Sequence, residues 1–149
     1  MAWDDREKQE IELDEGKVLT SYKDSLGNWT IGIGHLLGTD PKFQGITITG
    51  PECEEYFEED FNEAVKEAQS AFDGFEGLDG PRKGAIVNMA FQMGEKTLST
   101  FHTFLDYLDR GMYQEAALDL MNTRYARQVQ QRAKRIAYRI RTGQYAARQ

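Results

Sequence analysis

The chain has 149 residues, of which 40% are hydrophobic and 29% are charged, and its net charge at pH 7 is −7. This length suits one folding unit with a sizeable core. The single cysteine, Cys53, excludes an internal disulfide, and we expect it to be a buried, inert thiol. The acidic total excludes polyanion binding over the whole surface, although the charge is uneven. Residues 1–74 carry 18 acidic and 6 basic side chains, whereas residues 75–149 carry 7 and 12.

The N-terminal sequence MAWDDREKQE has neither the basic nor the apolar region of a signal peptide. No stretch approaches the roughly 20 apolar residues that cross a bilayer. We therefore expect no cleaved signal and no membrane insertion.

The first third of the chain predicts a helix followed by a small sheet. A charged run over residues 4–14 predicts a helix that ends at Gly16. Residues 18–23 and 29–33 alternate in the manner of strands around a turn that contains Gly27, which predicts a β-hairpin. Residues 46–48 are the expected third strand.

The rest of the chain predicts helices. Thr49 and Glu52 have capping-box spacing, and the apolar residues that follow recur every three or four positions as far as about Phe72. Asp79 opens the next helix, which is expected to stop at Gly94, and further helical patterns cover residues 101–109, 113–122 and 127–141.

These elements predict an α+β fold in a single domain, residues 1–149. The expected parts are a small antiparallel sheet lobe (14–50), a long connecting helix (51–73) and a helical lobe (74–149, with the N-terminal helix 4–14). A polymer substrate is expected to bind in a cleft between the two lobes.

Two carboxylates and a hydroxyl come from three consecutive elements: Glu15 ends a helix, Asp24 follows a strand and Thr30 begins the next. Such a set suits hydrolysis of a glycosidic bond, in which one carboxyl donates a proton while the other stays ionised. The apolar neighbours Leu13 and Val18 are expected to pack beside Glu15. Each of the three residues also has an ordinary structural interpretation. Glu15 fits a solvated surface carboxylate, and Thr30 fits an ordinary strand residue. Asp24 fits a turn residue whose side chain bonds the backbone two residues further on.

The same stretch carries a family resemblance. The motifs D-E-G, Y-K-D-x-x-G and W-T-I-G-I-G-H-L-L resemble the active-site segment of the phage-type lysozymes, glycoside hydrolase family 24, in particular those of the T-even bacteriophages. Three later segments agree in the same order: AIVNMAFQMGE, EAALDL and QRAKRIAYRIRTG. The resemblance therefore covers nearly the whole chain and supports a lysozyme-like fold.

The resemblance implies an N-acetylmuramidase that hydrolyses the β-1,4 bond between N-acetylmuramic acid and N-acetylglucosamine in peptidoglycan. Glu15 would be the general acid, and Asp24 would act with Thr30 to position and activate a water. We expect an inverting mechanism without metal or cofactor. The segment between His35 and Thr49 is shorter than in the T-even lysozymes, so the sheet lobe is expected to be smaller.

Expected substrate contacts also follow from the resemblance. Gly34 and Leu36 lie on the sheet side and Phe91 on the helical side, although the helical spacing of Phe91 equally fits a core residue. Phe104 and Asp119 occupy contact positions where the family has small polar residues. Arg132 is expected to pair with Glu15 across the cleft.

His35 follows a backbone turn and is expected to bond a nearby carboxylate or carbonyl. Because the chain has only two histidines, a histidine-based metal site or a Ser-His-Asp triad has little support.

The implied setting is a monomeric endolysin in the host cytoplasm, which reaches the wall after a separate permeabilising protein, a holin, opens the membrane. Its partner is peptidoglycan and not nucleic acid. Two other interpretations are an inactive lysozyme-like module that binds the wall or acts as a scaffold, and a nucleic-acid contact along the basic residues 124–141.

Overall fold

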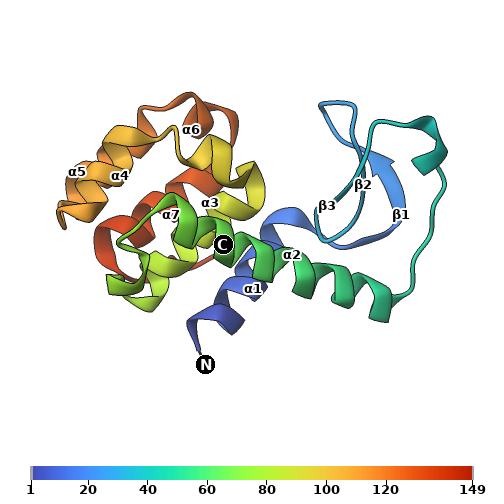
Figure 1. Cartoon of the computed structure of the whole chain (residues 1–149), viewed down its shortest axis with the longest axis horizontal. Coiled ribbons are helices and arrows are strands. Elements are labelled where there is room, and N and C mark those ends of the chain that lie inside the picture. The colour runs from blue at the N-terminus through green and yellow to red at the C-terminus, as the bar shows by residue number, and fades with distance from the viewer. Residues whose placement is uncertain (1, 149) are drawn as a thin grey trace. The chain divides into compact units, whose positions relative to one another are not determined.

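The computed structural model describes residues 2–148, so Met1 and Gln149 at the ends of the predicted domain lie outside it. Within these residues the chain forms seven α-helices, two 3₁₀ helices and one three-stranded antiparallel sheet (Figure 1), which confirms the α+β class. The contacts divide the chain into two units: the sheet unit, Lys8–Glu63, and the helical unit, Met1–Glu7 with Ala64–Gln149. None of the helices described is long and apolar enough to cross a membrane.

Three strands in the order β1-β2-β3 make the sheet: β1 is Val18–Lys23, β2 is Trp29–Gly32 and β3 is His35–Gly38. The predicted hairpin is confirmed, but the predicted third strand at 46–48 is wrong. Gly32 and Gly34, both with φ +66°, turn the chain straight back, so that β3 pairs with β2. Residues 46–48 run beside β1 and make only an isolated bridge, Thr47 to Thr20.

Helix α2, Gly50–Ala71, starts with the predicted capping box. The Glu52 amide donates to Thr49 Oγ1 at 3.2 Å, and the Thr49 amide donates to Glu52 Oε1 at 3.0 Å. One face of α2 supplies buried side chains that include Phe57, Phe61 and Cys53. Burial raises the pKa of the Cys53 thiol, and this fits the predicted inert cysteine.

The other helices are α1 (Trp3–Glu15), α3 (Gly80–Leu98), α4 (His102–Asp109), α5 (Tyr113–Met121), α6 (Arg124–Gln128) and α7 (Gln130–Thr142), and the 3₁₀ helices are Pro41–Phe43 and Phe75–Gly77. The predicted break at Gly94 is confirmed, because Gly94 has the non-helical angles φ 80° and ψ 165° and kinks α3 there. A second helical stretch then continues as far as Leu98. The single helix predicted over 127–141 is two helices, because Val129 leaves the helical region with φ −130°.

A buried polar network crosses the core of the helical unit. Glu7 pairs with Arg139, and it accepts hydrogen bonds from Asn88 Nδ2 at 2.9 Å and from the Tyr145 hydroxyl at 3.0 Å. Burial raises the pKa of Glu7, while the charge of Arg139 opposes that shift. Gly84 packs directly against the Glu7 carboxylate, where a larger side chain has no room. The network ties the start of α1 to α3 and α7.

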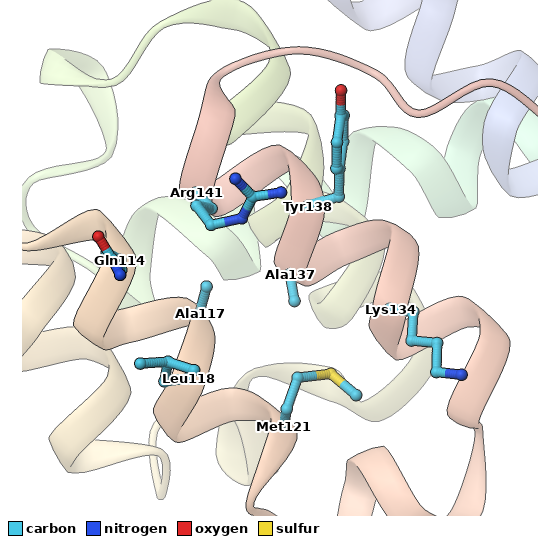
Figure 2. A pocket seen from close by; sticks show the side chains of 8 residues that line it. All are labelled: Gln114, Ala117, Leu118, Met121, Lys134, Ala137, Tyr138 and Arg141. Carbon is cyan, nitrogen blue, oxygen red and sulfur yellow. The ribbon is translucent and has the colours of Figure 1, made fainter.

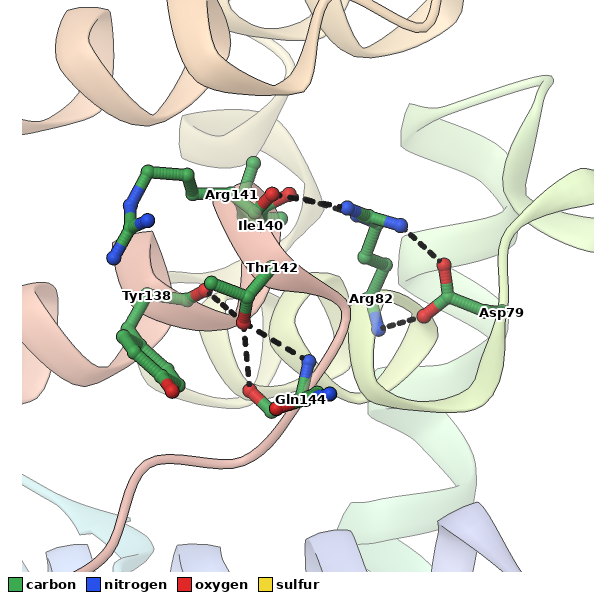
Figure 3. Close-up of polar contacts among 7 residues, drawn as sticks. All are labelled: Asp79, Arg82, Tyr138, Ile140, Arg141, Thr142 and Gln144. Carbon is green, nitrogen blue, oxygen red and sulfur yellow. Dashed lines mark hydrogen bonds and ion pairs between the residues drawn. The ribbon is translucent and has the colours of Figure 1, made fainter.

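Arg82 anchors the end of α7 (Figure 3). Its guanidinium donates to the main-chain carbonyls of Ile140 and Arg141 at 2.7 and 3.2 Å, and it pairs with Asp79 at 2.7 Å. Asp79 in turn caps α3 by accepting the amide of Arg82 at 3.1 Å. The last turn of α7 is therefore held through its backbone.

Candidate active site

Glu15 is the last residue of α1, half-buried where the helix gives way to β1. Gly16, with φ +76°, ends the helix, and its amide donates to the carbonyl of Glu12 at 2.8 Å. Gly34, in the turn before β3, faces the Glu15 carboxylate. A Cβ on Gly34 would lie 2.9 Å from Glu15 Oε2. The absence of a side chain at Gly34 thus gives the Glu15 carboxylate its space.

Asp24 lies just after β1 and is held by the turn that follows. Its Oδ1 accepts the amides of Leu26 at 2.9 Å and Asn28 at 2.8 Å. The predicted bond to the backbone two residues on is therefore confirmed. These bonds, above all the one from Asn28, lower the pKa of Asp24. Asp24 consequently stays ionised at neutral and mildly acidic pH.

Thr30 lies in β2, the middle strand of the sheet, and is 6% exposed. It pairs with Tyr22 of β1 on one side and with Leu36 of β3 on the other. Its hydroxyl donates to the main-chain carbonyl of Asn28 at 3.3 Å. Asn28 therefore holds both predicted residues, since its amide bonds Asp24 and its carbonyl bonds Thr30. Sequence reasoning missed Asn28, although its place inside the turn between them was visible.

Tyr22 is a second residue that sequence reasoning missed. Burial raises the pKa of its phenol, and the negative charges of Glu15 and Asp24 raise it further. Tyr22 therefore lies within electrostatic reach of both carboxylates and keeps its proton. The available signal was strand alternation, because Tyr22 lies in the predicted strand two positions before Asp24, and residues two apart in an extended chain point to the same side.

Leu13 does not supply the apolar cover predicted for Glu15. Leu13 is 63% exposed, and Val18 is 40% exposed. Positions two apart on an α-helix are separated by roughly 200° around its axis, so Leu13 and Glu15 lie on different sides of α1. Leu36, by contrast, is 58% exposed beside Thr30, where a ligand has access to it.

The sheet unit thus holds five predicted residues in two groups. In the first, Gly34 faces Glu15; in the second, Leu36 pairs with Thr30, and Thr30 is joined to Asp24 through Asn28. Tyr22 lies within electrostatic reach of both groups, because the charges of Glu15 and Asp24 both raise its pKa.

The remaining predicted contacts belong to the helical unit. Phe104 has no exposed surface, because it points into the core from α4, so its predicted contact with substrate is corrected to a core role. Phe91 is half-buried on α3. Asp119 lines an open hollow of about 290 Å³ together with residues that include His102 and Arg124. Arg132 is 9% exposed, and its Nε donates to Asn88 Oδ1 at 2.9 Å.

His35 bonds a carboxylate, as predicted. Its Nδ1 lies 2.7 Å from Asp60 Oδ2, and its ring stacks on Tyr56 with the centroids 4.5 Å apart. The bond to Asp60 raises the pKa of His35. In the part of the chain described, no three His, Cys, Asp or Glu side chains gather in a way that would hold a metal ion.

A family model described as phage lysozyme matches residues 12–142, the segment that contains Glu15, Asp24 and Thr30. The chain belongs to the phage lysozyme family. The resemblance noted from the motifs is therefore confirmed.

Individual relatives agree with this assignment. The chain is 34% identical to "Probable T4-type lysozyme 1" of Dictyostelium discoideum, over 91% of this chain and 94% of that protein. It is 30% identical to "Pre-baseplate central spike protein Gp5" of Enterobacteria phage T4, over 89% of this chain but 27% of that protein. It is also 32% identical to "Peptidoglycan hydrolase gp36" of Pseudomonas phage phiKMV, over 60% of this chain and 10% of that protein.

Proposed function

We propose that the chain is a peptidoglycan-degrading lysozyme that hydrolyses the β-1,4 bond between N-acetylmuramic acid and N-acetylglucosamine. The observation that carries the proposal is the arrangement in the sheet unit, where Gly34 leaves room for the Glu15 carboxylate and one turn residue, Asn28, holds Asp24 and Thr30. Family membership and the name of the phiKMV relative support the substrate class.

Glu15 acts as the general acid and donates its proton to the leaving glycosidic oxygen. Asp24 accepts a proton from the water whose oxygen attacks the anomeric carbon from the opposite face. The lowered pKa of Asp24 supports this role, because a base has to be ionised at the working pH. The result is inversion, which in general requires carboxyl groups about 6.5 to 9.5 Å apart.

Thr30 positions the attacking water. A hydroxyl has one proton and two lone pairs, and the proton of Thr30 is directed to the carbonyl of Asn28. Its oxygen is therefore left as an acceptor for one hydrogen of the water, and the other hydrogen goes to Asp24.

Saccharide contacts are assigned to Gly34 and Leu36 in the sheet unit and to Phe91, Asp119 and Arg132 in the helical unit. Arg132 is proposed to form an ion pair with Glu15. Arg132→Ala should lower activity without abolishing it, and full activity in a folded variant would remove Arg132 from the site.

The deciding experiment is clearing of purified Gram-negative peptidoglycan by the native chain and by Glu15→Gln, with circular dichroism of both. Glu12→Gln is the matched control, because Glu12 is an exposed acid on the same helix. We expect loss of clearing in Glu15→Gln alone. Equal clearing by all three proteins would place the acid elsewhere, and no clearing by the native chain would favour a module that binds the wall without cutting it.

The stereochemistry has its own test. NMR of a freshly cleaved oligosaccharide should show the α-anomer first, and early β-anomer would overturn inversion.

The proposed setting is a monomeric endolysin that reaches the wall from the host cytoplasm with the help of a holin. Expression in a Gram-negative host should lyse cells only when a holin is co-expressed. Lysis at the same rate without one would remove the holin from the proposal.

A further inference from the structure

The turn between β1 and β2 contains an asparagine side chain to which the proposed reaction gives no role. The Asn28 carboxamide donates from Nδ2 to Asp24 Oδ2, with the two atoms 3.4 Å apart. Within residues 2–148 this is the one hydrogen bond of the Asn28 side chain, and the one that Asp24 receives from a side chain. The contact therefore joins the half-buried Asn28 side chain directly to the proposed base.

The backbone at position 28 does not require an asparagine. Asparagine is common in turns partly because it tolerates a left-handed backbone. In this turn, however, the positive φ of +84° belongs to Gly27, and every described residue with a positive φ is a glycine. The main-chain amide and carbonyl of Asn28 bond Asp24 and Thr30, but any residue except proline supplies both groups. What asparagine adds at this position is its side chain.

The two carboxylate oxygens of Asp24 are bonded differently. Oδ1 accepts two main-chain amides, from Leu26 at 2.9 Å and from Asn28 at 2.8 Å, whereas Oδ2 accepts the longer bond from the Asn28 carboxamide. Both lone pairs of Oδ1 are thus engaged, while Oδ2 keeps one for an incoming proton. Bonds to Oδ1 alone leave the carboxylate free to turn, because the χ2 torsion of aspartate is broad. The bond to Oδ2 restricts that rotation.

We propose that Asn28 is, through its side chain, a positioning residue for the base that activates water, an inference that rests on the proposed function. The carboxamide holds the plane of the Asp24 carboxylate so that Oδ2 faces the attacking water. The main-chain carbonyl of the same residue directs the Thr30 hydroxyl. One residue thereby sets both groups between which the water is proposed to lie.

The bond also affects the ionisation of Asp24. Its pKa is lowered most by the main-chain amide of Asn28, and the Leu26 amide and the Asn28 side chain lower it further, while burial opposes them. Loss of the carboxamide removes a donor to the charged form, so the pKa of Asp24 rises toward its ordinary value. A base works only when it is ionised, so activity is then lost at a higher pH on acidification.

Three other ionisable groups lie near Asp24 and bear on this prediction. Lys23 precedes it on β1 and holds its ammonium over the Trp29 ring, 5.7 Å from the centroid. Tyr22, also on β1, keeps its proton, because burial and the charges of Glu15 and Asp24 raise its pKa. Glu15, at the end of α1, is the other carboxyl, so the direct titration of Asp24 is made in Glu15→Gln.

The kinetic test compares the pH dependence of kcat/KM on soluble glycan strands for the native chain and Asn28→Leu, with circular dichroism of both. We expect the acid limb of the variant to move to higher pH, and kcat on the plateau to fall about tenfold with little change in KM. Asn28→Ala is a second variant, in case the larger side chain disturbs the turn. A purely structural role lowers activity equally at every pH, so an unmoved acid limb in the folded variants would overturn the proposal.

Two controls remove an amide side chain elsewhere. Asn62→Leu makes the same substitution at an exposed position of α2 in the sheet unit. Gln114→Leu changes an exposed residue of α5 that lines a groove between α5 and α7 in the helical unit (Figure 2). Both should keep the native acid limb, and a shift as large as that of Asn28→Leu in either would overturn the assignment to Asn28.

The direct test needs no turnover. NMR of ¹³C-labelled aspartate carboxyls follows the titration of Asp24 in Glu15→Gln with and without Asn28→Leu. We expect Asp24 to titrate at higher pH when the carboxamide is absent, and coincident curves would overturn the proposal even where the muramidase activity stands. Failure of the muramidase proposal appears separately, as undiminished clearing by Glu15→Gln.

Discussion

Gly34→Ala separates the position of Glu15 from the stability of the fold. Gly34 has φ +66°, which costs a residue with a Cβ about 1 to 2 kcal/mol. The new Cβ would also lie 2.9 Å from Glu15 Oε2. Because that atom ends a flexible side chain, the carboxylate can move aside at little further cost in stability. The move displaces the proposed acid, and a misplacement of about 1 Å can cost about 100-fold in rate.

Gly45→Ala is the matched control. Gly45 has φ +75°, and nothing lies within 4 Å of the position that its new methyl group would take. Both variants should lower the unfolding midpoint by similar amounts, about 2 to 8 °C for 1 to 2 kcal/mol in a chain of this size. Thermal unfolding followed by circular dichroism, together with peptidoglycan clearing well below both midpoints, makes the comparison. Equal clearing by the two variants would refute the argument that Gly34 exists to give the Glu15 carboxylate room.

Three further predictions concern other contacts. Because Asp60 raises the pKa of His35 above its unfolded value of about 6.5, their stabilising interaction is complete below that pH and is lost as pH rises through the higher folded pKa. In urea unfolding, Asp60→Asn should therefore destabilise the chain more near pH 5.5 than near pH 9; a loss independent of pH would contradict it. Glu7→Ala leaves Arg139 buried without its carboxylate and should cost about 3 to 5 kcal/mol in the same assay, whereas a loss below about 1 kcal/mol would mean that the network relaxes freely. Tyr22→Phe should lower kcat about tenfold with little change in KM, because the phenol lies within electrostatic reach of both proposed catalytic carboxylates; Tyr56→Phe is the control, and equal kcat values would exclude Tyr22 from the site.

Interactions between residues close in the chain were predictable. The capping box of Thr49 and Glu52, the end of α1 at Gly16 and the bond from the Leu26 amide to Asp24 all join groups within a few positions of one another. Their geometry follows from backbone conformation and side-chain chemistry, which the sequence states directly. The motif around Glu15, Asp24 and Thr30 was similarly readable, and it led to the correct family.

Only the tertiary structure decided which distant groups meet. A strand pattern does not specify its partner, so β3 was missed until the turn at Gly32 and Gly34 was seen to return the chain onto β2. Helical spacing likewise does not say whether Phe104 faces the core or a ligand. The Glu7–Arg139 pair joins residues 132 positions apart, and no local pattern encodes such a contact. Partner choice depends on packing summed over the whole core, where many compact arrangements satisfy the same local preferences and the one that buries and pairs all groups together prevails.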